Sequence, residues 1–388
     1  MEDIPAEYQI EPQQLLFAGN AYFNFINSLK SPNTKTTYIQ CLKQYMQYRK
    51  VKAVDELLIG DQRLLQSNII EYLVSLQQIS HGTRYLYAAV LRHFYDINDI
   101  LLNWKKINAF LGQSNKVVND RAYTKPEIAA LLEKSYDRMK VVILLLASTG
   151  MRSGVIPTLK IRNLKKIEEY GLYQITVYEK AKEQYTTFCT PECTKSVDSY
   201  LECRRRYGET ITPNSPLIRD EFDRNDILHI KHPRHISVKT LTRLLDNLLI
   251  ACGIRKREPL LERQQTPVIR RKDAMLTHAF RKYVNTAMIR ADLKSLNKEL
   301  LLGHRSSIGL ENSYYRPNDS ELLQDYLKAV DLLTVSDENR LKQENQKIKQ
   351  RNDALEKDKD EVTALRKELE PLLALKNTLI KEGVLKES

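Results

Sequence analysis

The chain has 388 residues, of which 42% are hydrophobic and 28% are charged, and its net charge is +12. This length suffices for two or three domains with full cores, and the composition excludes a chain that is disordered throughout. No apolar run approaches the roughly 18 residues of a membrane-spanning helix. The N-terminal MEDIPAEYQI lacks the apolar core of a signal peptide, so we expect neither a membrane anchor nor export.

The five cysteines are odd in number and scattered along the chain, which argues against a disulfide framework and for the cytoplasm. Cys189 and Cys193 are closely spaced, but no second Cys or His pair stands at zinc-finger spacing. We therefore expect no metal ion and no cofactor.

The positive charge is unevenly distributed along the chain. Residues 1–16 carry four acids and no base, and residues 336–388 carry twelve of each sign, so residues 17–335 hold an excess of +16. A basic body between neutral or acidic ends favours a polyanion as partner, most simply nucleic acid. The alternative is a basic protein with no such partner.

The first part of the chain has helical periodicity from residue 16 to about residue 115. After a flexible segment 1–15, we expect a helix that ends before Ser31-Pro32 and further helices over 37–48, 68–76 and 83–94. Tyrosines and bases alternate along these helices, as in Lys35, Tyr38 and Lys43, a pattern that suits contacts with DNA phosphates. The competing interpretation places most of these tyrosines in the core.

Residues 112–124 are polar and read as a linker after this helical segment. The second predicted domain, 116–330, begins within the linker. Thr124 and Pro126 are typical of a helix start, and residues 140–148 predict a buried helix. Residues 173–178 and 185–189 read as two strands around the charged turn EKAKEQ. The predicted fold class is mainly α with a small antiparallel β-sheet (α+β).

The tail, residues 336–385, has no aromatic residue and alternates in charge. Its apolar residues recur every seven positions at Leu341, Ile348, Leu355, Val362 and Leu369, which predicts a long C-terminal helix that could form a coiled coil. The first half lacks a second apolar position, so a solvated single helix is the alternative.

Four separate motifs in the second domain carry side chains suited to chemistry. They are STGMR (148–152), the turn KAK (180–182), LTHAFRK (276–282) and LLGH (301–304), the last followed by YYRP (314–317). His278 and Arg281 stand three apart on a predicted helix, so both project from one side of it.

This ordered set resembles the tyrosine recombinase (phage integrase) family, most closely integrases of archaeal mobile elements, over most of residues 16–330. The family pattern is an Arg after Thr-Gly, a Lys on a β-hairpin, His-x-x-Arg, Leu-Gly-His, and a Tyr about ten residues later. The matching residues are Arg152, Lys182, His278, Arg281, His304 and Tyr314. The resemblance implies that residues 16–115 are a helical DNA core-binding domain and that residues 116–330 are the catalytic domain.

The resemblance also implies how DNA is cut without a metal. A tyrosine hydroxyl attacks the phosphodiester and forms a 3′-phosphotyrosine, while two guanidiniums neutralise the phosphorane. This assigns Tyr314 as nucleophile and Arg152 and Arg281 as phosphate ligands. Lys182 would protonate the leaving oxygen, and His278 would accept the tyrosine proton. His304 would donate a hydrogen bond to the phosphate.

Three points stay open at this stage. Lys180 lies in the same turn as Lys182, and Tyr315 competes with Tyr314; apolar Ile308 and Leu310 precede Tyr314 at helical spacing and favour it. Val155 stands where the family usually has an acidic residue that supports the first arginine.

We therefore expect a site-specific recombinase or integrase of a mobile element that acts on double-stranded DNA. The resemblance implies a homo-tetramer on DNA, a Holliday-junction intermediate and a cytoplasmic, nucleoid-associated prokaryotic setting. Accessory DNA-bending proteins are further candidate partners. The alternatives are a type IB topoisomerase-like DNA-relaxing enzyme and a cleavage-dead DNA-binding protein.

Overall fold

The computed structural model describes residues 19–112, 120–221, 226–256, 276–304 and 317–336, together with a few residues of the tail between 351 and 371. These residues fall into two compact units, one that ends before Asp120 and one that begins there. Across these residues, no helix is both long and apolar enough to span a membrane.

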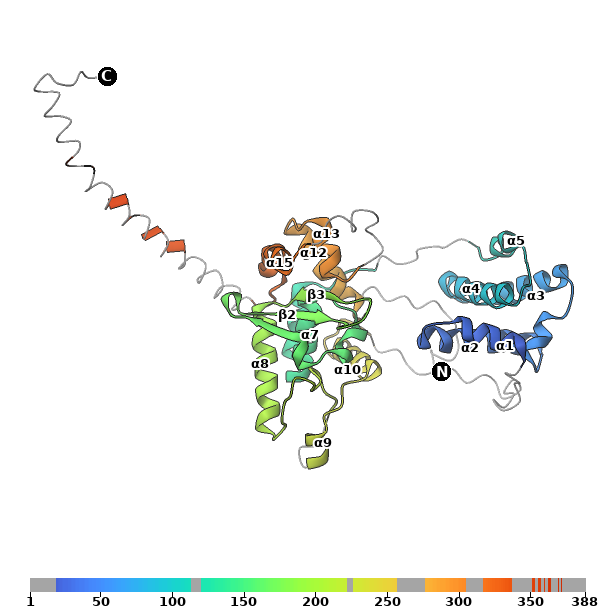
Figure 1. Ribbon diagram of the computed structural model, residues 1–388, viewed down its shortest axis with the longest axis horizontal. Helices are drawn as coiled ribbons and strands as arrows, with labels where there is room; N and C mark the ends of the chain where they lie inside the picture. The colour runs from blue at the N-terminus through green and yellow to red at the C-terminus, as the bar shows by residue number, and fades with distance from the viewer. Residues whose placement is uncertain are drawn as a thin grey trace, which may run out of the picture. The chain divides into compact units, whose positions relative to one another are not determined.

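The first unit is a helical bundle over residues 19–112 (Figure 1). Its elements are α1 (Asn20–Ser28), α2 (Pro32–Arg49), the 3₁₀ helix η3 (Val54–Leu58), α3 (Gln62–Ser75), α4 (His81–Ile97) and α5 (Trp104–Ala109). Polar side chains start several of them: the Asp61 carboxylate accepts from the Leu64 N–H at 2.7 Å, and the Ser80 hydroxyl caps α4. These helices therefore begin earlier than apolar periodicity alone predicted.

Aromatic side chains fill the core of this bundle. Phe25 and Phe94 meet edge to face with centroids 5.6 Å apart, and the buried Tyr95 hydroxyl donates to the Leu57 carbonyl at 3.0 Å. Tyr45 is also buried, whereas Tyr85 is 57% exposed. The core interpretation thus holds for some of the tyrosines, and others lie on the surface.

The second unit combines helices with one small sheet (Figure 1). Its α-helices are α6 (Lys125–Glu133), α7 (Asp137–Thr149), α8 (Pro191–Arg206), α9 (Ile227–Lys231), α10 (Val238–Ala251), α12 (His278–Arg290), α13 (Ser295–Leu301) and α15 (Asp319–Leu333). The strands are β1 (Leu164–Ile167), β2 (Leu172–Val177) and β3 (Tyr185–Phe188), and the 3₁₀ helices are η4 (Ser153–Thr158), η5 (Ile161–Asn163) and η6 (Glu168–Tyr170).

Helix α7 lies in the core of this unit and packs against α6, α8 and α12. Nearly all of its side chains are buried, which explains its unbroken apolar sequence. The Tyr326 hydroxyl of α15 donates to the Ser148 carbonyl at 3.0 Å and so joins α15 to the end of α7. The position of that end decides where Arg152 lies.

The start of α6 follows the predicted capping pattern. The Thr124 side chain accepts from the Glu127 N–H while the Glu127 carboxylate accepts from the Thr124 N–H at 2.8 Å, and Pro126 stands in the first turn.

The sheet has the order β1-β2-β3, and both pairs are antiparallel. Val177 of β2 pairs with Tyr185 of β3, so the residues between them form a hairpin that carries Lys180 and Lys182. Figure 1 shows β2 and β3 next to each other in this unit.

The predicted fold class is confirmed: the second unit is mainly α with a three-stranded antiparallel sheet, and the first is helical. All five cysteines are free thiols, and Cys189 and Cys193 are buried in the core. The described residues of the tail are helical, and Leu355, Val362 and Leu369 are each about half exposed, at 57%, 51% and 51%.

Candidate active site

The first predicted site residue follows the C-terminal end of α7. Gly150 ends the helix at φ 63°, and its N–H donates to the Leu146 carbonyl at 3.1 Å. A Cβ at this position would lie 2.8 Å from Leu302 Cδ2, so both the backbone angle and the packing require glycine. After this turn Met151 points into the core and Arg152 is exposed.

The second arginine comes from the first turn of α12. Arg281 is 6% exposed; its Nη1 donates to the Gly150 carbonyl at 2.9 Å and its Nη2 to the Leu302 carbonyl at 2.5 Å. Arg152 Nη1 approaches the neighbouring Gly303 carbonyl at 3.5 Å. Both guanidiniums therefore lie at the turn formed by Leu302 and Gly303.

Neither guanidinium forms an ion pair with an acidic side chain within the described part of the chain. Burial lowers the pKa of Arg281, and the nearby positive charge of Arg152 lowers it further. Two adjacent cations, one of them buried, are costly unless an anion joins them. Arg281 still has Nε–H and a second N–H on each Nη, so it keeps donors that a phosphate could accept.

His304 follows the same turn and is fixed by a carboxylate. Its Nδ1 lies 2.5 Å from Glu299 Oε2, while Glu299 Oε1 lies 3.1 Å from Lys298 Nζ. Burial would raise the pKa of Glu299, but the hydrogen bonds from His304 and Lys298 outweigh burial and the pKa is lowered.

His278 and Arg281 share one side of α12, yet they differ in burial. His278 is the first residue of the helix and is exposed, whereas Arg281, one turn later, is buried. Phe280 packs on Tyr123 with ring centroids 4.6 Å apart and anchors the helix.

The Lys-bearing hairpin reaches the same turn through Tyr185. A Cβ on Gly303, whose φ is 66°, would lie 2.5 Å from Tyr185 Cε1, so the tyrosine ring packs directly on the glycine. Lys182 itself is exposed in the hairpin, and no ion pair forms on it among the residues that the structure describes. Lys180 has φ 65°, and its N–H donates to Gln184 Oε1 at 2.7 Å.

The Tyr185 hydroxyl is buried and has no hydrogen-bond partner among the described residues. Burial raises the pKa of Tyr185 to about 12, although the Arg281 and Arg152 guanidiniums act in the opposite direction. The phenol therefore stays protonated and contributes no negative charge to the site.

The structure thus brings Arg152, Arg281 and His304 together at the Leu302–Gly303 turn and places Lys182 on the hairpin whose Tyr185 packs against that turn. His278 lies on α12, three residues before Arg281. Tyr314 and Tyr315 lie outside the described residues.

Sequence reasoning missed Glu299 and Tyr185. Glu299 stands five residues before His304, and Tyr185 stands three residues after Lys182. Neither residue is part of the family pattern on which the site prediction was based. Val155, at the position of the expected acid, is fully buried and belongs to the apolar core. Glu299, by contrast, contacts His304 and Lys298. Within the described ranges, no group of three or more His, Cys, Asp or Glu is placed to hold a metal ion.

Comparison with solved structures identifies the fold. The Tn1549 transposon integrase in complex with a circular-intermediate DNA aligns with a TM-score of 0.52 and 12% identity over 80% of this chain and 100% of that one. The same integrase with transposon right-end DNA gives a TM-score of 0.50 and 12% identity over 80% and 99% of the two chains. XerA recombinase shares 21% identity at a TM-score of 0.36 over 79% and 97%.

No family model and no curated protein matches the chain. The chain therefore has the fold of the Tn1549 transposon integrase.

Proposed function

We propose that this chain is a site-specific tyrosine recombinase of a mobile element, which cuts and rejoins double-stranded DNA through a covalent 3′-phosphotyrosine. The observation that carries the proposal is the pair of adjacent arginines, Arg152 and Arg281, neither of which forms an ion pair with an acidic side chain among the described residues. The Tn1549 integrase structures, which contain DNA, support the same conclusion through their fold.

The chemistry follows from the side chains at the turn. Arg152 and Arg281 bind the non-bridging oxygens of the scissile phosphate and neutralise the charge of the phosphorane. The Tyr314 oxygen attacks phosphorus and loses its proton to His278, and the bond to the 5′ oxygen breaks as Lys182 protonates that oxygen. Reversal of these steps by the 5′ hydroxyl of another strand completes exchange.

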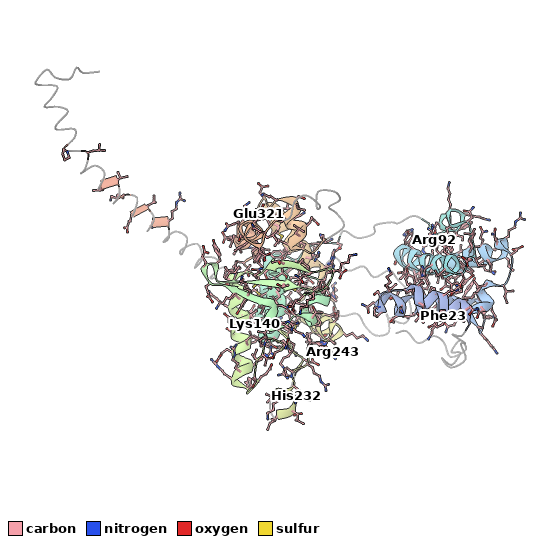
Figure 2. All side chains as sticks on the ribbon, viewed as in Figure 1. Phe23, Arg92, Lys140, His232, Arg243 and Glu321 are labelled. Atoms are coloured by element: carbon pink, nitrogen blue, oxygen red, sulfur yellow. The ribbon has the colours of Figure 1, made fainter. Side chains whose placement is uncertain are left out.

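Surface charge provides a means of holding DNA on each unit. Lys239 and Arg243 are exposed one turn apart on α10, while Leu241, Leu245 and Leu249 on its other side are buried. Figure 2 labels Arg243 on this unit and Arg92 on α4 of the first. We propose that these bases contact phosphates and that a homo-tetramer assembles on two DNA sites.

Covalent capture tests the proposal without knowledge of the DNA site. The full chain is incubated with duplexes that carry a randomised core, the reaction is stopped with detergent, and protein-linked DNA is recovered and sequenced. We expect enrichment of one sequence, which then serves as a nicked substrate for rate measurements.

Two further results separate the alternatives. Joining of two enriched duplexes indicates recombination, whereas relaxation of a supercoiled plasmid without joining indicates a topoisomerase. Tight binding of DNA with no covalent adduct would overturn the proposal in favour of a DNA-binding protein. Adduct formation that EDTA abolishes and magnesium restores would contradict the metal-free mechanism.

A further inference from the structure

Glu299 holds one ring nitrogen of His304 while it is itself held by Lys298. Its carboxylate accepts at Oε2 from His304 Nδ1 at 2.5 Å and pairs through Oε1 with Lys298 Nζ at 3.1 Å. The Glu299 side chain is 17% exposed, and its backbone carbonyl also accepts from the His304 N–H at 2.9 Å. The imidazole is therefore tied at Nδ1, and Nε2 is the nitrogen left for a ligand.

The charges around this turn explain why a carboxylate is needed there. Arg152 and Arg281 donate to the Gly303 and Leu302 carbonyls, and Lys298 contacts Glu299. The phenol of Tyr185 packs beneath Gly303 and is uncharged. A proton on His304 would add a further positive charge to these three cations, and the Glu299 carboxylate offsets that repulsion.

The protonation of the two ring nitrogens decides which hydrogen bonds His304 can donate. A neutral ring that donates from Nδ1 has a bare Nε2, which accepts hydrogen bonds and does not donate them. Only the doubly protonated ring donates from Nδ1 to Glu299 and from Nε2 to a phosphate oxygen together.

We propose that Glu299 is a positioning residue that holds the His304 ring with Nε2–H directed at the bound phosphate, an inference that rests on the proposed recombinase function. Glu299 acts through His304 and does not itself touch DNA. Its carboxylate replaces water as the partner of Nδ1, so the ring is oriented before DNA arrives.

Nitrogen NMR of the full chain labelled with ¹⁵N-histidine tests the contact without DNA. The His304 signals are assigned from their loss in His304→Gln, and the isosteric Glu299→Gln removes the charge. We expect the His304 Nδ1 signal to differ between wild type and Glu299→Gln, because the carboxylate that accepts from Nδ1 is lost in the variant. Identical His304 spectra in the two proteins over the whole pH range would overturn the proposal.

Cleavage of the enriched duplex tests the consequence. Glu299→Gln should slow adduct formation by roughly tenfold or more, the effect of losing a hydrogen bond to a charged group. The same change in a His304→Gln background should add nothing, because Glu299 acts through the histidine. Equal losses in both backgrounds would show that Glu299 acts independently and would overturn the assignment.

Two controls keep these results interpretable. Glu202→Gln removes a carboxylate from an exposed ion pair on α8 and should leave both measurements unchanged. Glu299→Asp keeps the charge on a shorter side chain and should fall between wild type and Glu299→Gln. If the wild-type chain forms no adduct, the proposed function fails, and the NMR comparison alone then decides whether Glu299 controls His304.

Discussion

The two arginines stand out because neither guanidinium forms an ion pair with an acidic side chain among the described residues. Arg281 donates two hydrogen bonds to the Gly150 and Leu302 carbonyls, which fix the guanidinium without neutralising its charge. Arg152 lies close enough to oppose its charge. A phosphate removes this repulsion and satisfies the remaining donors in one step.

Tyr314 is the proposed nucleophile, and its substitution tests that assignment directly. Tyr314→Phe removes the oxygen that forms the phosphotyrosyl bond, so adducts on the enriched duplex should vanish while DNA binding persists. Denaturing gels and a gel-shift titration measure the two properties. Tyr315→Phe is the matched control and should still form adducts; the opposite pattern would move the assignment by one residue.

Gly303 is a second residue whose identity follows from geometry. Gly303→Ala should lower the free energy of unfolding by about 1–2 kcal/mol for the left-handed backbone and by a further ~1–3 kcal/mol for the clash with Tyr185. Urea denaturation measures the loss.

Gly171→Ala isolates the contribution of the clash. Gly171 has nearly the same backbone angle, φ 60°, but nothing lies within 4 Å of its added Cβ. Its substitution should therefore cost only the backbone part. Equal losses at both glycines would contradict the close packing of Tyr185 on the turn.

Among the elements, the hairpin between β2 and β3 carries Lys182, the proposed general acid. Val177 pairs with Tyr185, and the Tyr185 ring rests on Gly303, so the base of the hairpin is fixed to the turn that precedes His304. Lys182 lies beyond this fixed base and is exposed, which gives its long side chain freedom to reach a leaving oxygen.

The role of Lys182 predicts a specific chemical rescue. Lys182→Ala should slow adduct formation about 100-fold or more, the usual contribution of a general acid. A substrate with sulfur in place of the leaving 5′ oxygen should restore most of the rate, because a thiolate departs without a proton. Lys180→Ala should change the rate little on either substrate. Rescue of Lys180→Ala and not of Lys182→Ala would exchange their roles.

At the scale of the whole molecule, the uneven charge predicts how the chain holds DNA. The +16 excess of residues 17–335 should make affinity fall steeply with salt, because several phosphates are neutralised together and their counterions released. We expect a loss of at least about tenfold between roughly 50 and 200 mM salt in a gel-shift titration. A flat response would contradict phosphate-dominated binding.

The C-terminal tail should not be needed for folding or cleavage by the second unit. The chain before it is anchored at the end of α15: Lys125 Nζ donates to the Thr334 carbonyl at 2.9 Å, and the Glu192 carboxylate accepts from the Val335 N–H at 2.9 Å. Deletion after Asp337 removes neither contact, so the second unit should fold and cleave as before.

Assembly should respond differently to the same deletion. Leu355, Val362 and Leu369 are about half exposed, so this apolar stripe is available to another protomer. We expect the truncated protein to form smaller complexes on DNA by sedimentation and to recombine less. An unchanged complex size together with full recombination would show that the tail is a solvated appendage.

The class of fold, the order of the motifs and several local features could be predicted from the amino-acid sequence. The helix start at Thr124 and Pro126, the buried helix α7 and the antiparallel strands β2 and β3 follow from side-chain chemistry within a few residues of each position. Helix ends were less predictable, because caps such as Asp61 add turns that carry no apolar signal.

Which motif residues meet, and which side chains support them, depends on how the separate segments pack in three dimensions. Arg152, Arg281 and His304 come from segments far apart in the chain, and they converge because Gly150 and Gly303 allow close packing around Leu302 and Tyr185. Val155, at the position where the family usually has an acid, is buried in the apolar core, and the Glu299 carboxylate contacts His304 and Lys298. Which charged groups meet depends on distances between segments, which spacing along the chain does not encode.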